Sequence, residues 1–220
     1  MTIAAASLKS AVTGSLHRAP IIAVVRHADR AVAARQARAF LRSGLEMIEI
    51  TFTVPRGADL VRELLAERPH DSMVRIGMGT VTTAARAKEA VAAGSEFLVT
   101  PNVSAPVADV ARSHDLFLCM GALTPSELVA AHELGADLLK VYPLPLVGGP
   151  AYLARIREPL GDLAPMLAGG GFGIEEIPAY RAAGASAFGI GGPLLGNDDA
   201  STTGNIHRAL SLARAEQLTS

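Results

Sequence analysis

Lys140 is the residue whose type and surroundings point most directly to covalent chemistry. Only three of the 20 basic residues are lysines, at positions 9, 88 and 140, and arginine supplies the rest. Lys140 stands inside the apolar run 137–143, and alternation along a strand puts its side chain on the face that does not meet helices. Apolar neighbours favour the neutral amine, which can attack a carbonyl carbon and form a Schiff base. The alternative is a structural lysine that reaches solvent or pairs with an acid.

An acid that could serve this lysine stands in an earlier run. Alternation along residues 46–53 places Glu49, Thr51 and Thr53 on one face, which we expect to point inward as Lys140 does. The two groups could form a structural ion pair. Alternatively, Glu49 could move protons through a water molecule while the lysine nitrogen is bonded to carbon. Two inward ionisable groups on different strands favour the catalytic interpretation.

Two glycine-rich segments follow late apolar runs, at residues 168–171 and 189–192. Bare backbone N–H groups at such strand ends can hold a phosphate group. Glycines at strand ends also serve tight turns, so each segment alone is weak evidence. Their occurrence after two successive runs favours a phosphate site.

The elements that must position these residues recur regularly. Short apolar runs are each followed by a Gly, Pro or Thr cluster and an amphipathic stretch, which predicts eight strands with a helix after each. The spacing suits right-handed parallel crossovers and predicts a (β/α)8 TIM barrel of one domain over residues 1–220. A doubly wound open sheet would use the same units, but no GxGxxG follows the first run. The predicted strands are 21–26, 46–52, 74–80, 97–101, 116–122, 138–143, 165–170 and 187–192.

Composition narrows the class of partner. The 220 residues carry a formal net charge of −1 and 4% aromatic residues, and the arginines are scattered, which argues against a nucleic-acid partner. Residues 1–20 predict a short leading helix, and no stretch approaches the roughly 20 apolar residues of a membrane span. We therefore expect a small-molecule substrate.

The cysteine and histidine pattern bears on redox compartment and metal binding. The single cysteine, Cys119, cannot form an internal disulfide, so a reducing cytoplasm fits best. Because Cys119 lies in an apolar run, we expect it in the core rather than as a nucleophile. No Cys or Cys/His cluster has metal-ligand spacing, and the sequence predicts neither a metal site nor a cofactor.

With these residues in place, the chain resembles the KDPG/KHG aldolase family over about residues 20–196. Four motifs in order carry the resemblance. Residues 49–51 (EIT) match the glutamate motif of the second strand, and residues 76–81 (IGMGTV) match the family's GAGTV. Residues 99–102 (VTPN) match its TPN segment, and residues 139–143 (LKVYP) match its K-[FI]-F-P.

The resemblance implies a class I aldolase that cleaves a 2-keto-3-deoxy-6-phospho sugar acid to pyruvate and glyceraldehyde 3-phosphate. It also implies a homotrimer. Lys140 would be the Schiff-base lysine and Glu49 the general acid and base. The substrate-binding residues implied or inferred are Arg26, Thr51, Thr53, Thr80, Pro101, Tyr142, Gly169, Gly170, Gly171, Gly191 and Gly192.

Three departures from the family pattern leave the substrate open. Thr53 stands where many gluconate-type members have an arginine, and Arg26 closes the first strand as in the galactonate branch. We expect Arg26 to bind the substrate carboxylate, the alternative being an ion pair with Glu49 or a neighbouring acid. Pro193 and Gly169 remove donors that other members have in the phosphate pocket. Galactonate-type, 4-hydroxy-2-oxoglutarate and unphosphorylated substrates therefore stay open.

Two other function classes fit the same fold. An isomerase or synthase of the phosphate-binding barrel group would place Asp or His at strand ends, whereas the six histidines here fall in predicted helices and loops. A non-catalytic ligand-binding barrel would have no need of both Lys140 and Glu49. A covalent pyruvyl adduct trapped with borohydride would separate the aldolase from both alternatives.

Overall fold

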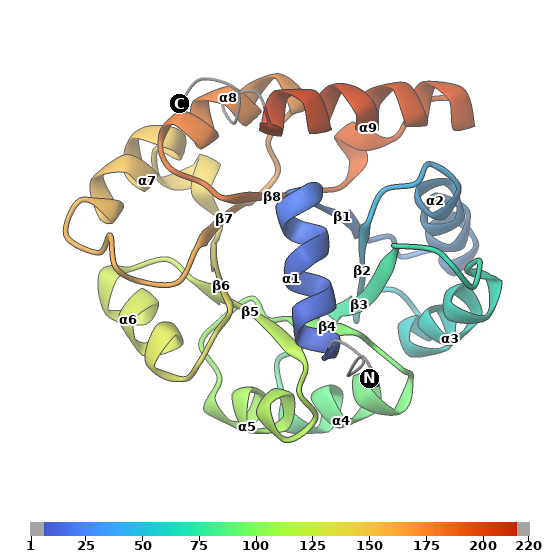
Figure 1. Ribbon diagram of the computed structural model, residues 1–220, viewed down its shortest axis with the longest axis horizontal. Helices are drawn as coiled ribbons and strands as arrows, with labels where there is room; N and C mark the ends of the chain where they lie inside the picture. The colour runs from blue at the N-terminus through green and yellow to red at the C-terminus, as the bar shows by residue number, and fades with distance from the viewer. Residues whose placement is uncertain (1–6, 215–220) are drawn as a thin grey trace, which may run out of the picture.

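Eight parallel strands close into a barrel in chain order, with β1 paired to β8 (Figure 1). The structure is a computed structural model that describes residues 7–214. The closed pairing confirms the predicted TIM barrel and excludes the open sheet. The strands are β1 Ile21–Val25, β2 Met47–Thr51, β3 Arg75–Gly79, β4 Phe97–Val99, β5 Phe117–Ala122, β6 Leu138–Val141, β7 Met166–Gly169 and β8 Ala187–Ile190.

The strands lie within the predicted runs, and each is one or two residues shorter than its run. The run 97–101 shows why, because β4 ends at Val99. The Thr100 hydroxyl donates to the carbonyl of Asn102 and accepts the amide of Gly121, which turns the chain out of the sheet. Pro101 has no N–H with which to continue the ladder. The residues after the strand ends therefore belong to the loops that carry the site.

Helices surround the barrel and follow each strand, as the sequence predicts. Each helix buries one face against the strands, and α6 begins with a reciprocal cap between Thr124 and Glu127. The α-helices are α1 Leu8–Arg18, α2 Arg30–Arg42, α3 Gly57–Glu67, α4 Ala84–Ala92, α5 Ala105–Ser113, α6 Pro125–Glu133, α7 Gly149–Arg157, α8 Ile177–Ala182 and α9 Asp199–Arg214. Short 3₁₀ turns are η1 Leu144–Val147, η2 Ile174–Glu176 and η3 Gly192–Leu194.

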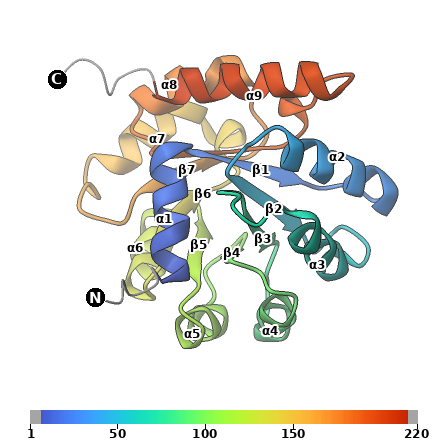
Figure 2. The same cartoon turned by 45° about the vertical axis from the view of Figure 1, so that its right-hand side comes forward.

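The leading helix α1 lies across the amino-terminal end of the barrel (Figures 1 and 2). Its Val12 and Leu16 join the apolar cluster inside the barrel. Two ion pairs fix its ends, Lys9 to Asp137 at 2.7 Å and Arg18 to Glu46 at 2.7 Å. The predicted short helix is therefore confirmed over 8–18, and residues 1–6 lie outside the described residues. The helix closes one end of the barrel and leaves the carboxyl ends of the strands at the other.

The barrel interior is filled by apolar side chains below the strand ends. This inner cluster contains Phe97, Val99, Cys119, Leu138 and Leu167. Cys119 is fully buried, and this burial raises the pKa of its thiol to about 12. The expectation that Cys119 is a core residue is confirmed. A second, larger cluster fills the layer between the strands and the helices.

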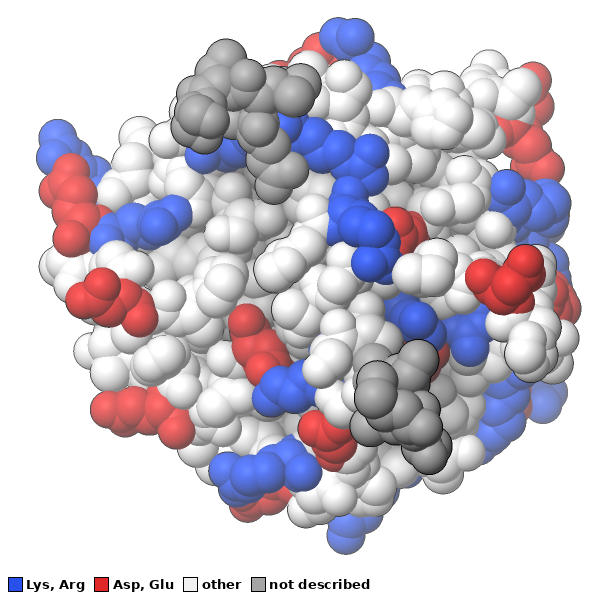
Figure 3. Space-filling model, viewed as in Figure 1, with Lys and Arg blue, Asp and Glu red and all other residues white. Residues whose placement is uncertain are grey.

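Acidic and basic side chains lie interspersed on the face that carries α1 (Figure 3). Among the described residues, charged side chains of neighbouring helices form ion pairs, such as Arg38–Glu67 and Arg42–Asp199. Among residues 7–214, no helix is long and apolar enough to cross a membrane.

Candidate active site

Lys140 and Glu49 meet inside the barrel at the carboxyl ends of β6 and β2. The Lys140 Nζ lies 4.0 Å from the Glu49 Oε2, and the two side chains are 11% and 2% exposed. This separation is too long for a direct hydrogen bond. The Glu49 Oε1 is buried and has no hydrogen-bond partner. A buried carboxylate oxygen without a partner is costly to keep, so it is available to bind a substrate hydroxyl or a water molecule.

Glycine on β3 makes room for Glu49. Gly79 pairs with Thr51 in the sheet, one strand from the carboxylate. A Cβ added at Gly79 would lie 1.8 Å from the Glu49 Oε1, so no other residue type fits there unless Glu49 moves. This contact explains the glycine of the IGMGTV segment by packing, since Gly79 sets the position of the acid.

Glycine on β5 plays the same part for the loop after β4. Gly121 pairs with Lys140, and a Cβ on Gly121 would lie 2.3 Å from the carbonyl carbon of Pro101. Pro101 is thereby brought over the strand next to the lysine. The structure thus places the predicted pocket residue Pro101 beside the centre of the site.

Tyr142 follows β6 and lies at the rim of the barrel. Its side chain is 41% exposed, and its ring centroid is 5.5 Å from the Lys140 Nζ. At this distance the electron-rich ring face stabilises a cationic nitrogen, including the iminium form of a Schiff base. The aromatic neighbour expected for Lys140 is therefore in contact range.

Arg26 extends from the end of β1 across the ends of the next two strands. Its guanidinium donates to the Thr80 hydroxyl at 3.1 Å and to the Thr53 hydroxyl at 3.4 Å. The Thr53 hydroxyl also lies 2.7 Å from that of Thr51, which donates to the backbone carbonyl of Val25. Arg26 forms no ion pair with an acid within residues 7–214, so the alternative ion pair with Glu49 is wrong.

Thr80 holds a backbone conformation that few side chains adopt. Its φ is 58°, in the left-handed region, directly after β3. The strain is of the order of 1 kcal/mol for a residue of this type. It turns the hydroxyl toward Arg26 at the mouth of the barrel.

A cavity of about 360 Å³ opens above Lys140. Eight predicted site residues line it: Arg26, Lys140, Tyr142, Gly169, Gly170, Gly171, Gly191 and Gly192. The other five predicted site residues do not line this cavity. They are close to it because they contact the residues around Lys140 and Arg26, as described above: Glu49, Thr51, Thr53, Thr80 and Pro101. The remaining lining residues are Val24, Gln36, Phe172, Gly189, Ile190 and Pro193.

Backbone N–H groups gather where the loops after β7 and β8 border this cavity. Gly170 and Gly171 have φ values of 130° and 88°, which L side chains rarely adopt. A Cβ at Gly191 would lie 2.7 Å from the carbonyl oxygen of Val24. Within the described residues, the amides of Gly170, Gly171 and Gly191 have no backbone acceptor. Three free N–H groups on one rim can bind an anion without a basic side chain.

Gln36 is a lining residue that the sequence-based reasoning missed. It comes from helix α2 rather than from a strand end. Strand-end position was the signal used to find the other residues, and it does not apply to a helix. The polar Gln36 between the buried alanines of α2 is a weak signal that would have needed the orientation of the helix.

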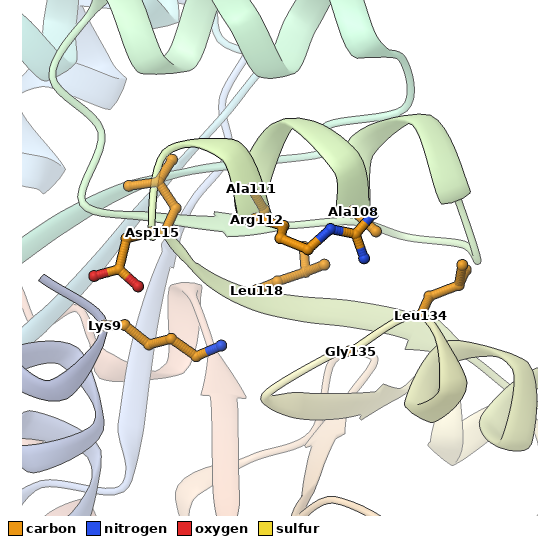
Figure 4. A pocket seen from close by; sticks show the side chains of 9 residues that line it. Lys9, Ala108, Ala111, Arg112, Asp115, Leu118, Leu134 and Gly135 are labelled. Carbon is orange, nitrogen blue, oxygen red and sulfur yellow. The ribbon is translucent and has the colours of Figure 1, made fainter. Parts of the chain in front are cut away.

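A second cavity, of about 210 Å³, lies between α1, α5 and the end of α6 (Figure 4). Both cationic side chains that line it form ion pairs, Lys9 with Asp137 and Arg112 with Asp109. It is far from the strand ends that carry Lys140, because α1 covers the opposite end of the barrel. We find no grouping for catalysis there. Within residues 7–214, no group of three or more His, Cys, Asp or Glu could hold a metal ion.

Comparison with known proteins places this chain in a family. The family model for KDPG and KHG aldolase matches residues 12–212. The 2-dehydro-3-deoxy-phosphogluconate aldolase of Pseudomonas aeruginosa is 32% identical over 163 residues, which cover 74% of this chain and 71% of the relative. The 2-dehydro-3-deoxy-6-phosphogalactonate aldolase of Escherichia coli is 26% identical, covering 80% and 84%.

The fold comparison agrees with the sequence comparison. The solved native KDPGal structure superposes with a TM-score of 0.78 at 25% identity, covering 89% of this chain and 95% of that one. The family-model match, residues 12–212, includes all eight strands, Lys140 and Glu49. The chain therefore belongs to the KDPG and KHG aldolase family and is an aldolase, a carbon–carbon lyase.

Proposed function

We propose that the protein is a class I aldolase that forms a Schiff base through Lys140 and cleaves a 2-keto-3-deoxy-6-phospho sugar acid. The observation that carries the proposal is the buried pair of Lys140 and Glu49, 4.0 Å apart below the cavity, with one carboxylate oxygen unpartnered. Relatives named as gluconate-type and galactonate-type aldolases support the substrate class.

The reaction begins at the carbonyl carbon of the keto acid. The Lys140 nitrogen attacks C2, and loss of water from the carbinolamine gives an iminium. Glu49, through a water molecule, removes the proton of the C4 hydroxyl. The C3–C4 bond then breaks, its electrons pass into the iminium as an enamine, and the aldehyde leaves.

The second half of the cycle returns the proton. The Glu49 side now gives a proton to C3 of the enamine, which forms the pyruvyl imine. Attack by water on that imine releases pyruvate and restores the lysine. The 4.0 Å gap fits this division, because Glu49 reaches the reacting atoms rather than holding the lysine nitrogen in a direct hydrogen bond.

Arg26 supplies the charge that a bound carboxylate needs. A carboxylate moved from water into a cavity requires a cation or several hydrogen bonds. Arg26 lines the cavity, and Thr80 and Thr53 orient its guanidinium through their hydroxyls. We assign the carboxylate of the keto acid to this side, near Lys140.

The phosphate of the acceptor aldehyde fits the rim formed by Gly170, Gly171 and Gly191. The free amides there supply donors for phosphate oxygens, and the absence of side chains lets the ligand approach the backbone. The two stereochemical series, gluconate and galactonate, differ at C4, which faces Glu49. An assay of pyruvate release from a panel of substrates would distinguish the two series. The panel should contain gluconate-type and galactonate-type acids, each with and without the phosphate.

The Schiff base is tested by trapping. Incubation with pyruvate and borohydride should add one pyruvyl group to Lys140, as located by peptide mass spectrometry. Lys140→Ala should lose both the adduct and pyruvate release, whereas Lys88→Ala should keep both, because Lys88 is an exposed residue of α4. An adduct on Lys88 or Lys9 would overturn the mechanism.

The role of Glu49 is tested separately. We expect Glu49→Gln to slow turnover by about 10²-fold, the usual scale for loss of a positioned acid or base, while the fold remains. Circular dichroism and the melting temperature check the fold. Near-normal turnover in a folded variant would make Glu49 a structural partner of Lys140 instead.

A further inference from the structure

We propose that Gln36 is a specificity-determining residue that recognises the terminal oxygen atoms of the acceptor aldehyde. This inference rests on the proposed aldolase function and adds a residue that stands outside the strand ends. Gln36 is on α2, yet it lines the cavity together with Lys140 and the glycine rim.

The position of Gln36 follows from the two hollows that it borders. Besides the active-site cavity, it lines an adjoining hollow of about 410 Å³ formed by α2 and residues 195–202. Those residues come directly after η3, which begins at Gly192. Gln36 therefore stands at the β8 side of the cavity, where it separates the site from the outer hollow. This side is the glycine rim assigned to the distal end of the substrate.

The chemistry of the rim leaves a place for a side-chain donor. The five glycines of the rim have no side-chain donor, and Pro193 has neither a polar side chain nor an N–H. These glycines are Gly169, Gly170, Gly171, Gly191 and Gly192. Of the other polar lining residues, Arg26 is oriented by two threonine hydroxyls, Lys140 is the proposed nucleophile, and Tyr142 has its ring centroid 5.5 Å from the Lys140 Nζ. Within residues 7–214, the half-buried Gln36 side chain has no hydrogen-bond partner. Its amide is thus free to donate to a ligand.

Gln36 is also held firmly enough to discriminate. Helix α2 buries Ala33, Ala37 and Phe40 against the barrel, and the Asp29 carboxylate caps its first turn. Glutamine and glutamate have nearly the same shape. Exchange of the neutral amide for a carboxylate therefore adds a negative charge at the rim with little change in volume.

The test measures aldol addition of pyruvate to two acceptors that differ in charge, D-glyceraldehyde 3-phosphate and D-glyceraldehyde. We expect Gln36→Glu to lower kcat/KM for the phosphorylated acceptor at least tenfold and to change that for D-glyceraldehyde less than twofold. Gln36→Ala should lower the value for the phosphorylated acceptor about threefold or more. The KM for pyruvate and the rate of borohydride trapping should stay at the wild-type values.

Controls separate this inference from the proposed function. Ala31→Glu adds the same charge to an exposed position of α2 that does not line the cavity, and it should leave both acceptors unchanged. If wild-type protein forms no pyruvyl adduct, the proposed function fails. If the adduct forms and Gln36→Glu changes the ratio of the two acceptors less than threefold, Gln36 does not read the terminal group. An equal effect on pyruvate KM would also overturn the inference, because Gln36 would then act through Arg26.

Discussion

Substitution of Gly79 by alanine tests whether β3 fixes the position of Glu49, the proposed catalytic acid. The added Cβ would lie 1.8 Å from the Glu49 Oε1 and 2.3 Å from its Cδ, whereas ordinary contact begins at 3.4 Å. The carboxylate would have to withdraw by about 1.6 Å. A shift of about 1 Å at a reacting group can cost about 10²-fold in rate, so we expect kcat to fall by about that factor. Overpacking should cost about 1–3 kcal/mol of stability.

The assay follows pyruvate release at saturating substrate together with urea unfolding. Gly204→Ala is the matched control, because a Cβ at Gly204 meets nothing within 4 Å and the residue lies inside α9. This control should gain about 0.5–1 kcal/mol from helix propensity and keep full activity. The reasoning is refuted if folded Gly79→Ala retains kcat within threefold of wild type. In that case the carboxylate either tolerates the methyl group or does not act from its observed position.

Three further predictions concern binding, reactivity and pH. Arg26→Met should raise KM for the keto acid about tenfold or more, because a charged hydrogen bond to the substrate carboxylate is lost. The melting temperature should stay near the wild-type value. An unchanged KM in the folded variant would mean that the threonine hydroxyls and the backbone, rather than Arg26, bind the carboxylate. The Cys119 thiol, with its pKa raised to about 12 by burial, should react with a thiol reagent only after urea unfolding, so rapid labelling of the folded protein would contradict its core position. The backbone amides of Thr124 and Leu123, together with the Thr124 hydroxyl, hold the pKa of Glu127 below its ordinary value of 4.5. The stabilisation is therefore present above pH 4.5 and is lost as the pH falls through the folded pKa. Glu127→Gln should destabilise the protein at pH 7, by up to about 1 kcal/mol, and much less at pH 3, whereas Glu133→Gln, on an exposed residue of α6, should not show this difference in urea unfolding.

The strand order was predictable from the regular recurrence of one strand and one helix, which suits right-handed parallel crossovers. The inward direction of the two central residues was predictable because side chains alternate along a strand with a period of two. Alternation alone placed Lys140 and Glu49 inside the barrel, and the structure brings them to 4.0 Å. The proximity of Gly79 to Glu49 was not predictable, since it depends on the register between β2 and β3 rather than on either strand. A motif match pointed to the glycine without a reason for it.

The residues at the rim were harder to predict for two physical reasons. Arg26 has a long side chain with several torsions, and only the structure shows that it selects the hydroxyls of Thr53 and Thr80 over an acid. Gln36 reaches the cavity because of how α2 is rotated on the barrel, which depends on tertiary packing of its alanine face. The hydrophobic periodicity of a helix predicts which face is buried. It does not predict which polar residue beside that face borders the active-site cavity.

The seal that α1 makes across the amino-terminal end has a consequence for the order of events during turnover. Val12 and Leu16 of α1 join the inner cluster of Phe97, Cys119 and Leu138, so apolar side chains of the described residues fill the barrel between Lys140 and α1. In the proposed Schiff-base mechanism, water for hydrolysis of the imine would then come through the same mouth that admits the substrate. The aldehyde, while it occupied that mouth, would shield the C2 imine, and its departure would open the place from which water attacks. Under that mechanism, a barrel packed at its amino-terminal end would favour release of the aldehyde before hydrolysis of the imine, so that pyruvate would leave last.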